Sequence, residues 1–309
     1  MKKIFILAAV PVLMGKLNSN IRFSYTVTVT NGQATTPKFT FGVGAPAAVV
    51  DWGDGTAQSA VTSGVEMNHT YTTGGTYKVT LLMLRQDLWI TGIDISSDKV
   101  VGGVTPIQYF KNLTVFSGST NSTWVQNIAS WSFPTGLVNL TLASTGVIGN
   151  ISGWVLSASL QILYLNATGV TGNISGWVLP AGLQHLFMNG AAVTGDISGW
   201  TIPASLVNLI INYTGLTGTP IMTSASALAS FFYHGNSLTQ ANVDAVINAI
   251  YARRMSFTAA APALNISSNS APSGIYQAAN PPTTGKEKAY SLVNDNLVEG
   301  FHKWVITTA

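Results

Sequence analysis

The 23 residues from Asn150 to Gly172 read NISGWVLSASLQILYLNATGVTG, and the same pattern recurs before and after them. A tryptophan marks the copies at a constant interval of 23 residues. These tryptophans are Trp131, Trp154, Trp177 and Trp200. Four near-identical copies occupy residues 127–218, and looser copies with the same apolar spacing flank them on both sides. A fixed period in the twenties predicts that each copy is one structural unit, stacked on the next into a solenoid.

Each copy places leucines in the spacing L-x-x-L-x-L, as at Leu160, Leu163 and Leu165. This spacing resembles the leucine-rich repeat, and the segment TGNISGW with the Pro-containing stretch after it resembles the plant-type subclass. The resemblance implies one short parallel strand per repeat and an extended return segment. The buried Asn typical of that family is replaced by smaller residues, and a hydroxyl can do part of its work. The replacements are Thr145, Thr168, Ala191 and Thr214, while Asn survives at Asn236.

The region 21–84 alternates apolar and polar side chains, which predicts strands with one buried face. Between these strands lie the motif Val50-Asp51-Trp52-Gly53-Asp54-Gly55-Thr56 and then His69-Thr70-Tyr71 and Gly75-Thr76-Tyr77-Lys78-Val79. Together they resemble the polycystic-kidney-disease (PKD) type of immunoglobulin-like domain. The resemblance implies a β-sandwich with Trp52 in its core and the aspartates and glycines in a tight turn. It also implies a domain that spaces or presents its neighbours.

The last 71 residues, 239–309, are expected to cap the open end of the solenoid core. Thr239 is suited to N-cap a helix that buries Val243, Val246, Ile247 and Ile250. A strand at 264–266, a second helix with Ala289, Leu292, Val293 and Leu297 that stops near Gly300, and a last strand at 304–306 are predicted to follow. This ending resembles that of repeat proteins in bacteriophage fibre or structural proteins and in bacterial surface proteins.

The N-terminal segment 1–20 combines Lys2 and Lys3 with the apolar run from Ile4 to Met14. This pattern is typical of a secretory signal peptide, although the residues near Gly15 form a poor cleavage site. A retained apolar arm that buries itself in a neighbouring subunit is the alternative. The predicted fold is therefore mainly β, with an arm or signal peptide (1–20), an immunoglobulin-like β-sandwich (21–86), a leucine-rich-repeat solenoid (87–238) and a C-terminal α/β cap (239–309).

Composition limits the function classes. Only 8% of the residues are charged, and 14 basic against 11 acidic residues give a net charge of +3 without a basic patch. Nucleic acid is therefore not an expected partner. Since the chain has no cysteine, it has neither disulfides nor a thiolate metal site.

The titratable residues offer little for catalysis. The four histidines, His69, His185, His234 and His302, show no spacing typical of a metal site or of a base beside a nucleophile. The central repeats contain one acidic residue, Asp196, which disfavours glycoside hydrolysis by paired carboxylates. Asp51 and Asp54 could share a Ca²⁺, but the turn motif alone explains both residues. We expect no enzyme, no catalytic residue, no metal and no cofactor.

The side chains that leave the strands away from the core form the candidate binding site. Strand alternation places an aromatic row on the concave surface, flanked by amide and imidazole side chains. The candidate residues are Tyr164, Asn166, His185, Phe187, Asn189, Asn208, Ile210, Asn212, Phe232 and His234. They could stack on sugars or receive another protein. Alternatively, they form cross-strand ladders that stiffen the sheet. The tryptophan row is expected to pack rather than to contact a ligand.

These features favour a non-enzymatic virion surface protein of a bacteriophage, such as a fibre, spike or head decoration that contacts a host glycan or surface protein. The expected partners are other virion subunits and further copies of the same chain, in a homo-oligomer at the virion surface. A secreted or cell-surface bacterial adhesion protein is the alternative. A cleaved N-terminus would favour the second reading, and an intact Met1 within a particle the first.

Overall fold

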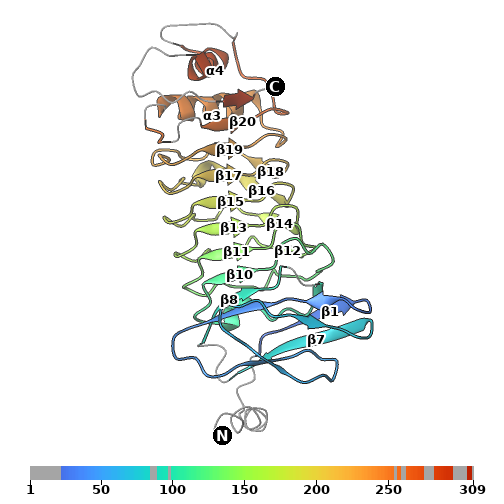
Figure 1. Ribbon diagram of the computed structural model, residues 1–309. Coiled ribbons are helices and arrows are strands. Elements are labelled where there is room, and N and C mark those ends of the chain that lie inside the picture. The colour runs from blue at the N-terminus through green and yellow to red at the C-terminus, as the bar shows by residue number, and fades with distance from the viewer. Residues whose placement is uncertain are drawn as a thin grey trace.

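The structure is a computed structural model, which describes residues 22–83, 89–96, 99–253, 256–258, 262–274, 282–294 and 305–307. These residues are mainly β-structure and stack into an elongated body, with an antiparallel sheet at one end and two helices at the other (Figure 1). A β-solenoid of about 6 turns lies between them, as the 23-residue period predicts. The predicted N-terminal arm or signal peptide, 1–20, lies outside the described residues.

The N-terminal sheet has the strand order β5-β4-β7-β1-β9. Its strands are β1 (Ser24–Val29), β4 (Val49–Asp51), β5 (Ser59–Ala60), β7 (Gly75–Leu82) and β9 (Val100–Gly102). Neighbouring strands run antiparallel, with Tyr25 opposite Val79 in the register of β1 and β7. Because the sequence alternates, Tyr25, Val27 and Val79 are buried while Thr28 and Lys78 are more exposed. A short antiparallel pair, β2 (Ala34–Thr35) and β6 (His69–Thr70), lies beside this sheet.

The solenoid sheet has ten strands in the order β21-β20-β19-β17-β15-β13-β11-β10-β8-β3. The strands β8 to β21 of this sheet are parallel, whereas β3 at its edge runs antiparallel to β8. The strands are β3 (Lys38–Phe41), β8 (Ile90–Asp94), β10 (Val115–Ser117), β11 (Asn139–Thr141), β13 (Ile162–Tyr164), β15 (His185–Phe187), β17 (Asn208–Ile210), β19 (Ser230–Phe232), β20 (Ala263–Asn265) and β21 (Val305–Thr307). The middle residue of each repeat strand points into the core, and Leu140, Leu163, Leu186 and Leu209 are fully buried in register.

A second parallel sheet of four short strands forms part of the return segments. Its strands are β12 (Ile148–Asn150), β14 (Gly169–Asn173), β16 (Ala192–Asp196) and β18 (Gly215–Thr217). Two 3-10 turns, η1 (Ile107–Tyr109) and η2 (Ile197–Gly199), complete the described return structure, in which α-helices are absent between residues 99 and 239. This agrees with the expectation that the return segments are extended.

The turns that leave the strands repeat one backbone device. In each turn, one residue in the left-handed conformation donates its N–H to a carbonyl of the next repeat. Ala167, for example, donates to the carbonyl of Asn189, the residue just before Gly190, which is the counterpart of Ala167. The residues in this conformation are Thr120, Ser144, Ala167, Gly190, Tyr213, Gly235 and Ser268. Within the described residues, the first six donate this hydrogen bond. The threonine hydroxyls after these residues donate to the carbonyl of the residue that directly follows each strand, as from Thr168 Oγ1 to Leu165 O at 2.6 Å. The threonines therefore replace part of the asparagine's work, and Asn236 keeps the full role by donating to the carbonyls of Ile211 and Tyr233.

The N-terminal sheet and the solenoid share one core rather than meeting at a polar interface. The ring of Phe23 packs edge-on against Phe39, Phe110 and Phe116, with centroids 5.9, 5.9 and 6.5 Å away. Strands also cross between the regions, since β3 joins the solenoid sheet and β9 joins the N-terminal sheet. The antiparallel β3 thereby covers the first edge of the parallel stack.

Toward the other end, where the sheet finishes with β20 and β21, helix α3 (Gln240–Ala252) connects β19 to β20 and begins at the predicted N-cap Thr239. Thr239 and Asn242 form a reciprocal capping box, and the predicted residues Val243, Val246, Ile247 and Ile250 are buried. Helix α4 (Gly285–Asn294) follows and is tied to α3 by Lys288 Nζ, which donates to Asn248 Oδ1 at 2.8 Å. Ala289 and Leu292 are buried as expected, whereas the predicted core residue Leu297 and the helix stop at Gly300 lie outside the described residues.

Candidate functional site

The outward side of strands β10 to β19, here called the outer face, brings the ten candidate residues into regular rows. The register aligns Tyr164, Phe187, Ile210 and Phe232 on successive strands. His185 and Asn208 form a second row, two residues earlier on their strands. Asn166, Asn189, Asn212 and His234 follow the strands at the turns. Most of these side chains are half-buried, but Asn212 is only 8% exposed and has little surface to offer a ligand.

The aromatic row contains one close stack. The rings of Tyr164 and Phe187 lie with centroids 4.5 Å apart and planes 18° apart. Each ring therefore covers one face of the other, as in a cross-strand ladder. A sugar can therefore stack only on the outer face of either ring. The outer face of Tyr164 is directed toward the much smaller Thr141 on β11. Burial raises the pKa of Tyr164, which keeps its hydroxyl protonated and able to donate a hydrogen bond.

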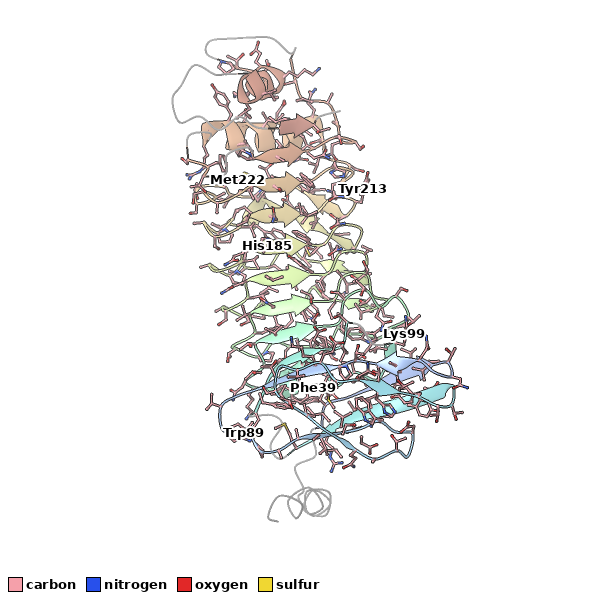
Figure 2. All side chains as sticks on the ribbon, viewed as in Figure 1. Phe39, Trp89, Lys99, His185, Tyr213 and Met222 are labelled. Atoms are coloured by element: carbon pink, nitrogen blue, oxygen red, sulfur yellow. The ribbon has the colours of Figure 1, made fainter. Side chains whose placement is uncertain are left out.

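The second row is linked by a polar contact. Asn208 Nδ2 lies 3.0 Å from His185 Nδ1, which Figure 2 labels beside the solenoid strands. Because an amide NH₂ can only donate, this contact requires His185 Nδ1 to accept, and the ring then carries its proton on Nε2. Burial lowers the pKa of His185, which favours this neutral form. The row is thus a neutral hydrogen-bonding strip with one remaining imidazole donor.

Tyr213 is an exposed aromatic residue that sequence reasoning missed. It lies at the edge of the sheet, is 61% exposed and packs edge-on against His234 with centroids 5.0 Å apart (Figure 2). Its backbone has φ +53°, an uncommon value for a bulky residue. The equivalent positions in the two preceding repeats are Ala167 and Gly190, so this single tyrosine in a row of small residues was the available sequence signal.

The outer face is electrically neutral over most of its length. Residues 112–195 contain no lysine, arginine, aspartate or glutamate, and Asp196 lies on β16 of the second sheet. Burial also lowers the pKa of His234, so that both histidines of the face favour their uncharged forms. The face is therefore suited to neutral polar ligands or to a neutral protein surface rather than to nucleic acid or other polyanions.

A pocket with a volume of about 210 Å³ lies at the N-terminal end of the same sheet. It is lined by Lys38, Thr40, Thr91, Gly92, Ile93, Asp94, Thr114, Val115 and Ser117, which come from β3, β8, β10 and the turns beside them. These residues were not among the candidates. The pocket depends on the pairing of β3 with β8, and the L-x-x-L-x-L pattern gives no signal for that pairing.

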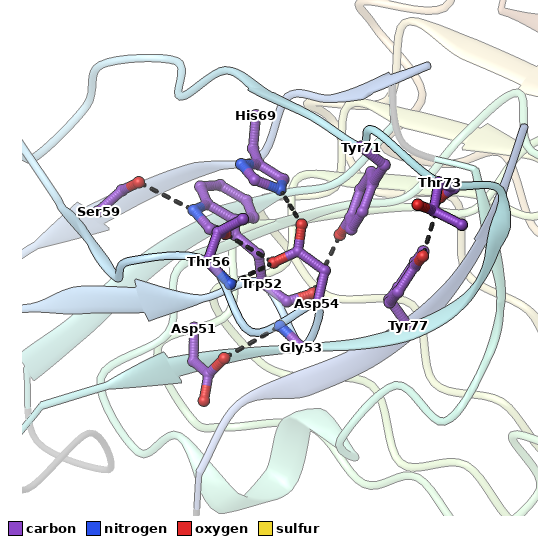
Figure 3. Close-up of polar contacts among 10 residues, drawn as sticks. All are labelled: Asp51, Trp52, Gly53, Asp54, Thr56, Ser59, His69, Tyr71, Thr73 and Tyr77. Carbon is purple, nitrogen blue, oxygen red and sulfur yellow. Dashed lines mark hydrogen bonds and ion pairs between the residues drawn. The ribbon is translucent and has the colours of Figure 1, made fainter. Parts of the chain in front are cut away.

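The Asp51–Thr56 turn forms a separate polar cluster in the N-terminal region (Figure 3). Asp51 Oδ1 accepts the N–H of Gly53 at 3.0 Å, and Asp54 Oδ1 accepts the N–H and hydroxyl of Thr56 at 3.0 and 2.6 Å. Asp54 Oδ2 lies 2.8 Å from His69 Nε2. Burial raises the pKa of Asp54, but these hydrogen bonds outweigh it and hold the pKa below its usual value of 3.8. The aspartates thus act as turn residues.

Aromatic packing holds the same turn in the core, where Trp52 was expected. The His69 ring stacks on the Trp52 ring with centroids 4.7 Å and planes 6° apart. Trp52 Nε1 donates to Ser59 Oγ at 2.8 Å, and the Tyr71 hydroxyl donates to the Trp52 carbonyl at 3.2 Å (Figure 3). In the described part of the chain, no group of three or more His, Cys, Asp or Glu lies close enough to hold a metal ion.

The tryptophan row packs, as predicted. Trp131, Trp154, Trp177 and Trp200 are all nearly buried, and the rings of Trp177 and Trp200 stack with planes 8° apart. Trp200 Nε1 donates to the carbonyl of Ile174 at 3.2 Å. This row is therefore part of the solenoid core and not of the candidate site.

These observations define the chain as a protein with a β-solenoid whose outer face is neutral and partly aromatic. No protein-family model matches the sequence, and no curated protein matches it. Among solved structures, the chain is similar to the crystal structure of a plant ice-binding protein, with 16% sequence identity and a TM-score of 0.28. The likeness covers 45% of this chain and 53% of that one, so it spans about half of the solved structure. None of the helices among the described residues has the length and apolarity that crossing a membrane requires.

Proposed function

We propose that this chain is a non-enzymatic binding protein that presents the outer face of its solenoid to a glycan or protein on a cell surface. The observation that carries the proposal is the row of side chains from Tyr164 to Phe232. These side chains point away from the core and lie half-buried on a neutral sheet. Rigid side chains lose little conformational entropy when a ligand binds to them. The amides and imidazoles beside the row supply hydrogen bonds without attracting polyions.

We place the protein at the surface of a bacteriophage virion, as a fibre, spike or head decoration that contacts the host. The sequence resemblances support this placement: a PKD-like immunoglobulin-type sandwich as spacer and leucine-rich repeats as the displayed part. The structure supports the coarser part of these resemblances, an antiparallel N-terminal sheet followed by a solenoid of 23-residue parallel turns. Further virion subunits, including copies of this chain, are the proposed partners.

A secreted bacterial adhesion protein is the second candidate, and Lys2, Lys3 and the apolar run to Met14 support it. Mass spectrometry of native material separates the two. An intact Met1 in a particle together with other virion proteins is expected for the first candidate. A shortened N-terminus on a protein secreted by a bacterium would replace it with the second.

The binding proposal is tested with the double substitution Tyr164→Ala and Phe187→Ala. We expect attachment to host cells, or binding to a glycan array, to fall at least tenfold, because the exposed ring faces and the tyrosine hydroxyl are lost. Since both side chains lie outside the core, the protein should still fold, as a melting curve will verify.

The matched control is the double substitution Val155→Ala and Val178→Ala. These valines lie on the return segments of the same repeats and are 84% and 83% exposed. The control removes exposed apolar surface from the same two repeats but leaves the outer face unchanged. Its binding should therefore equal that of the wild type. If the Tyr164 and Phe187 variant also binds as the wild type does, the aromatic row is not the binding site.

A further inference from the structure

The pocket beside β3 and the open side of the Tyr164 ring lie on the same sheet, with only small side chains between them. Along the register, Asp94 is followed by Ser117, Thr141 and Tyr164 on successive strands. Neighbouring strands lie about 4.8 Å apart, so this polar trough is roughly 14 Å long. It is bounded by Lys38 and Asp94 at one end and by the tyrosine ring at the other.

Internal hydrogen bonds fix the floor and walls of the trough. Thr141 Oγ1 donates to Ser117 Oγ at 3.1 Å. Asp94 Oδ1 accepts the N–H and the hydroxyl of Ser96 at 3.0 and 2.5 Å, which orients the carboxylate. Thr114 Oγ1 donates to the Thr91 carbonyl at 2.9 Å. These polar groups are therefore pre-organised before any ligand arrives.

The charges at the end of the trough favour an uncharged ligand. Lys38 and Asp94 are register partners on β3 and β8, but they form no ion pair within the described structure. An ammonium donor and a carboxylate acceptor with opposite charges suit a group that both donates and accepts hydrogen bonds, as sugar hydroxyls do. A ligand of either charge would meet one group of like sign.

We infer that this trough, from Lys38 and Asp94 to the outer ring face of Tyr164, binds the end of a neutral oligosaccharide. One sugar occupies the pocket, where its hydroxyls bond to Asp94 and Lys38. The following sugars cross Ser117 and Thr141, and the last of them stacks on the ring of Tyr164. The chain of sugars runs perpendicular to the strands. This inference rests on the proposed function and names the ligand class and the part of the outer face that it contacts.

Two substitutions test the trough apart from the Tyr164–Phe187 pair. Ser117→Tyr fills its middle, and the new ring can pack over the side chain of Thr141, the register partner of Ser117 on β11. Asp94→Asn keeps an oxygen that can accept from Ser96 but removes the charge. Lys99→Gln, an exposed lysine outside the trough, is the control. Binding is measured on an array of neutral oligosaccharides and oligosaccharides that contain uronic acids, with melting curves for every variant.

We expect the wild type and Lys99→Gln to bind neutral oligosaccharides equally, and both trough variants to lose at least tenfold in affinity. Three results would overturn the inference: no sugar bound by the wild type, unchanged binding by folded Ser117→Tyr, or a preference for uronic acids. The proposed function would survive each of these if host-cell attachment still depended on Tyr164 and Phe187. If attachment to host cells is insensitive to that pair, the proposed function fails. Loss of glycan binding in Asp94→Asn and Ser117→Tyr would then support only the pocket end of the trough and would overturn the stack on Tyr164.

Discussion

The side-chain oxygen of Asn150 occupies the space into which a Cβ on Gly172 would project. Asn150 Oδ1 accepts the N–H of Ser152 at 3.0 Å and its hydroxyl at 2.7 Å, which closes the turn before Trp154. The glycine of the next repeat packs against this turn with φ +121°. The arrangement recurs between Asn127 and Gly149 and between Asn173 and Gly195, so the repeated Gly-Asn pair links successive repeats.

The first prediction follows from this contact. Gly172→Ala should destabilise the protein by about 2 kcal/mol or more, because an alanine there is both strained and obstructed by Asn150. Gly153→Ala is the control, since its Cβ would meet no atom within 4 Å and its φ is not in the left-handed region. Chemical unfolding of both variants checks the prediction. Equal stability of the two would show that the Asn–Gly contact does not constrain the stack.

The second prediction concerns the leucine core. Leu183 is fully buried, and Leu183→Asp should cost several kcal/mol because it places an unpaired charge among apolar side chains. Gln184→Asp introduces the same charge one residue later, at an exposed position, and should change the melting temperature little. A folded Leu183→Asp protein that melts like the wild type would be incompatible with a continuous solenoid core.

The third prediction concerns Asp51 and Asp54, whose oxygens are engaged with Gly53, Thr56 and His69. If these residues are turn formers, a chelator should leave the melting temperature unchanged. Thermal scans with EDTA and with added Ca²⁺ test this directly. A rise of more than a few degrees on adding Ca²⁺ would reveal stabilisation by a bound ion and reassign the aspartates to a metal site.

The fourth prediction is a dependence of stability on pH. Burial lowers the pKa of His185 from 6.5, so the folded chain binds this proton less readily than the unfolded chain does. The resulting stability is present above about pH 6.5 and is lost as the pH falls through the lowered pKa of the folded state. His185→Gln keeps an amide oxygen for Asn208 but cannot titrate. Its melting temperature should fall less than that of the wild type between about pH 7.5 and pH 5.5. Parallel curves would exclude His185 as a source of the dependence.

The solenoid was predictable because it depends on residues that recur. A leucine or tryptophan that returns every 23 positions specifies both the inward direction and the register between neighbours, and the aligned rows from Tyr164 to Phe232 follow from that register. The helix at Thr239 was predictable for a local reason, since its cap and its buried face lie within a dozen residues of one another.

The pocket was not predictable, because it depends on a contact between distant segments. Lys38 lies opposite Asp94 only because β3 pairs with β8, and more than fifty residues separate them in the chain. The stacking of Tyr164 on Phe187 was also not predictable, because the sequence places both rings on one side of the sheet but does not set the angle between the ring planes. That angle decides which ring faces a ligand can reach.

The antiparallel strand β3 lies at one edge of the stack and β21 at the other, and each central repeat between them pairs only with its two neighbours in a constant register. A 23-residue unit can therefore be inserted or removed in the middle without changing either end. Each unit changes the separation of the two ends by about 4.8 Å, the spacing of neighbouring strands. The length of the repeat region therefore changes in discrete steps. Duplication or loss of single units in the gene sets the distance between the two ends of the protein and between the groups attached to them.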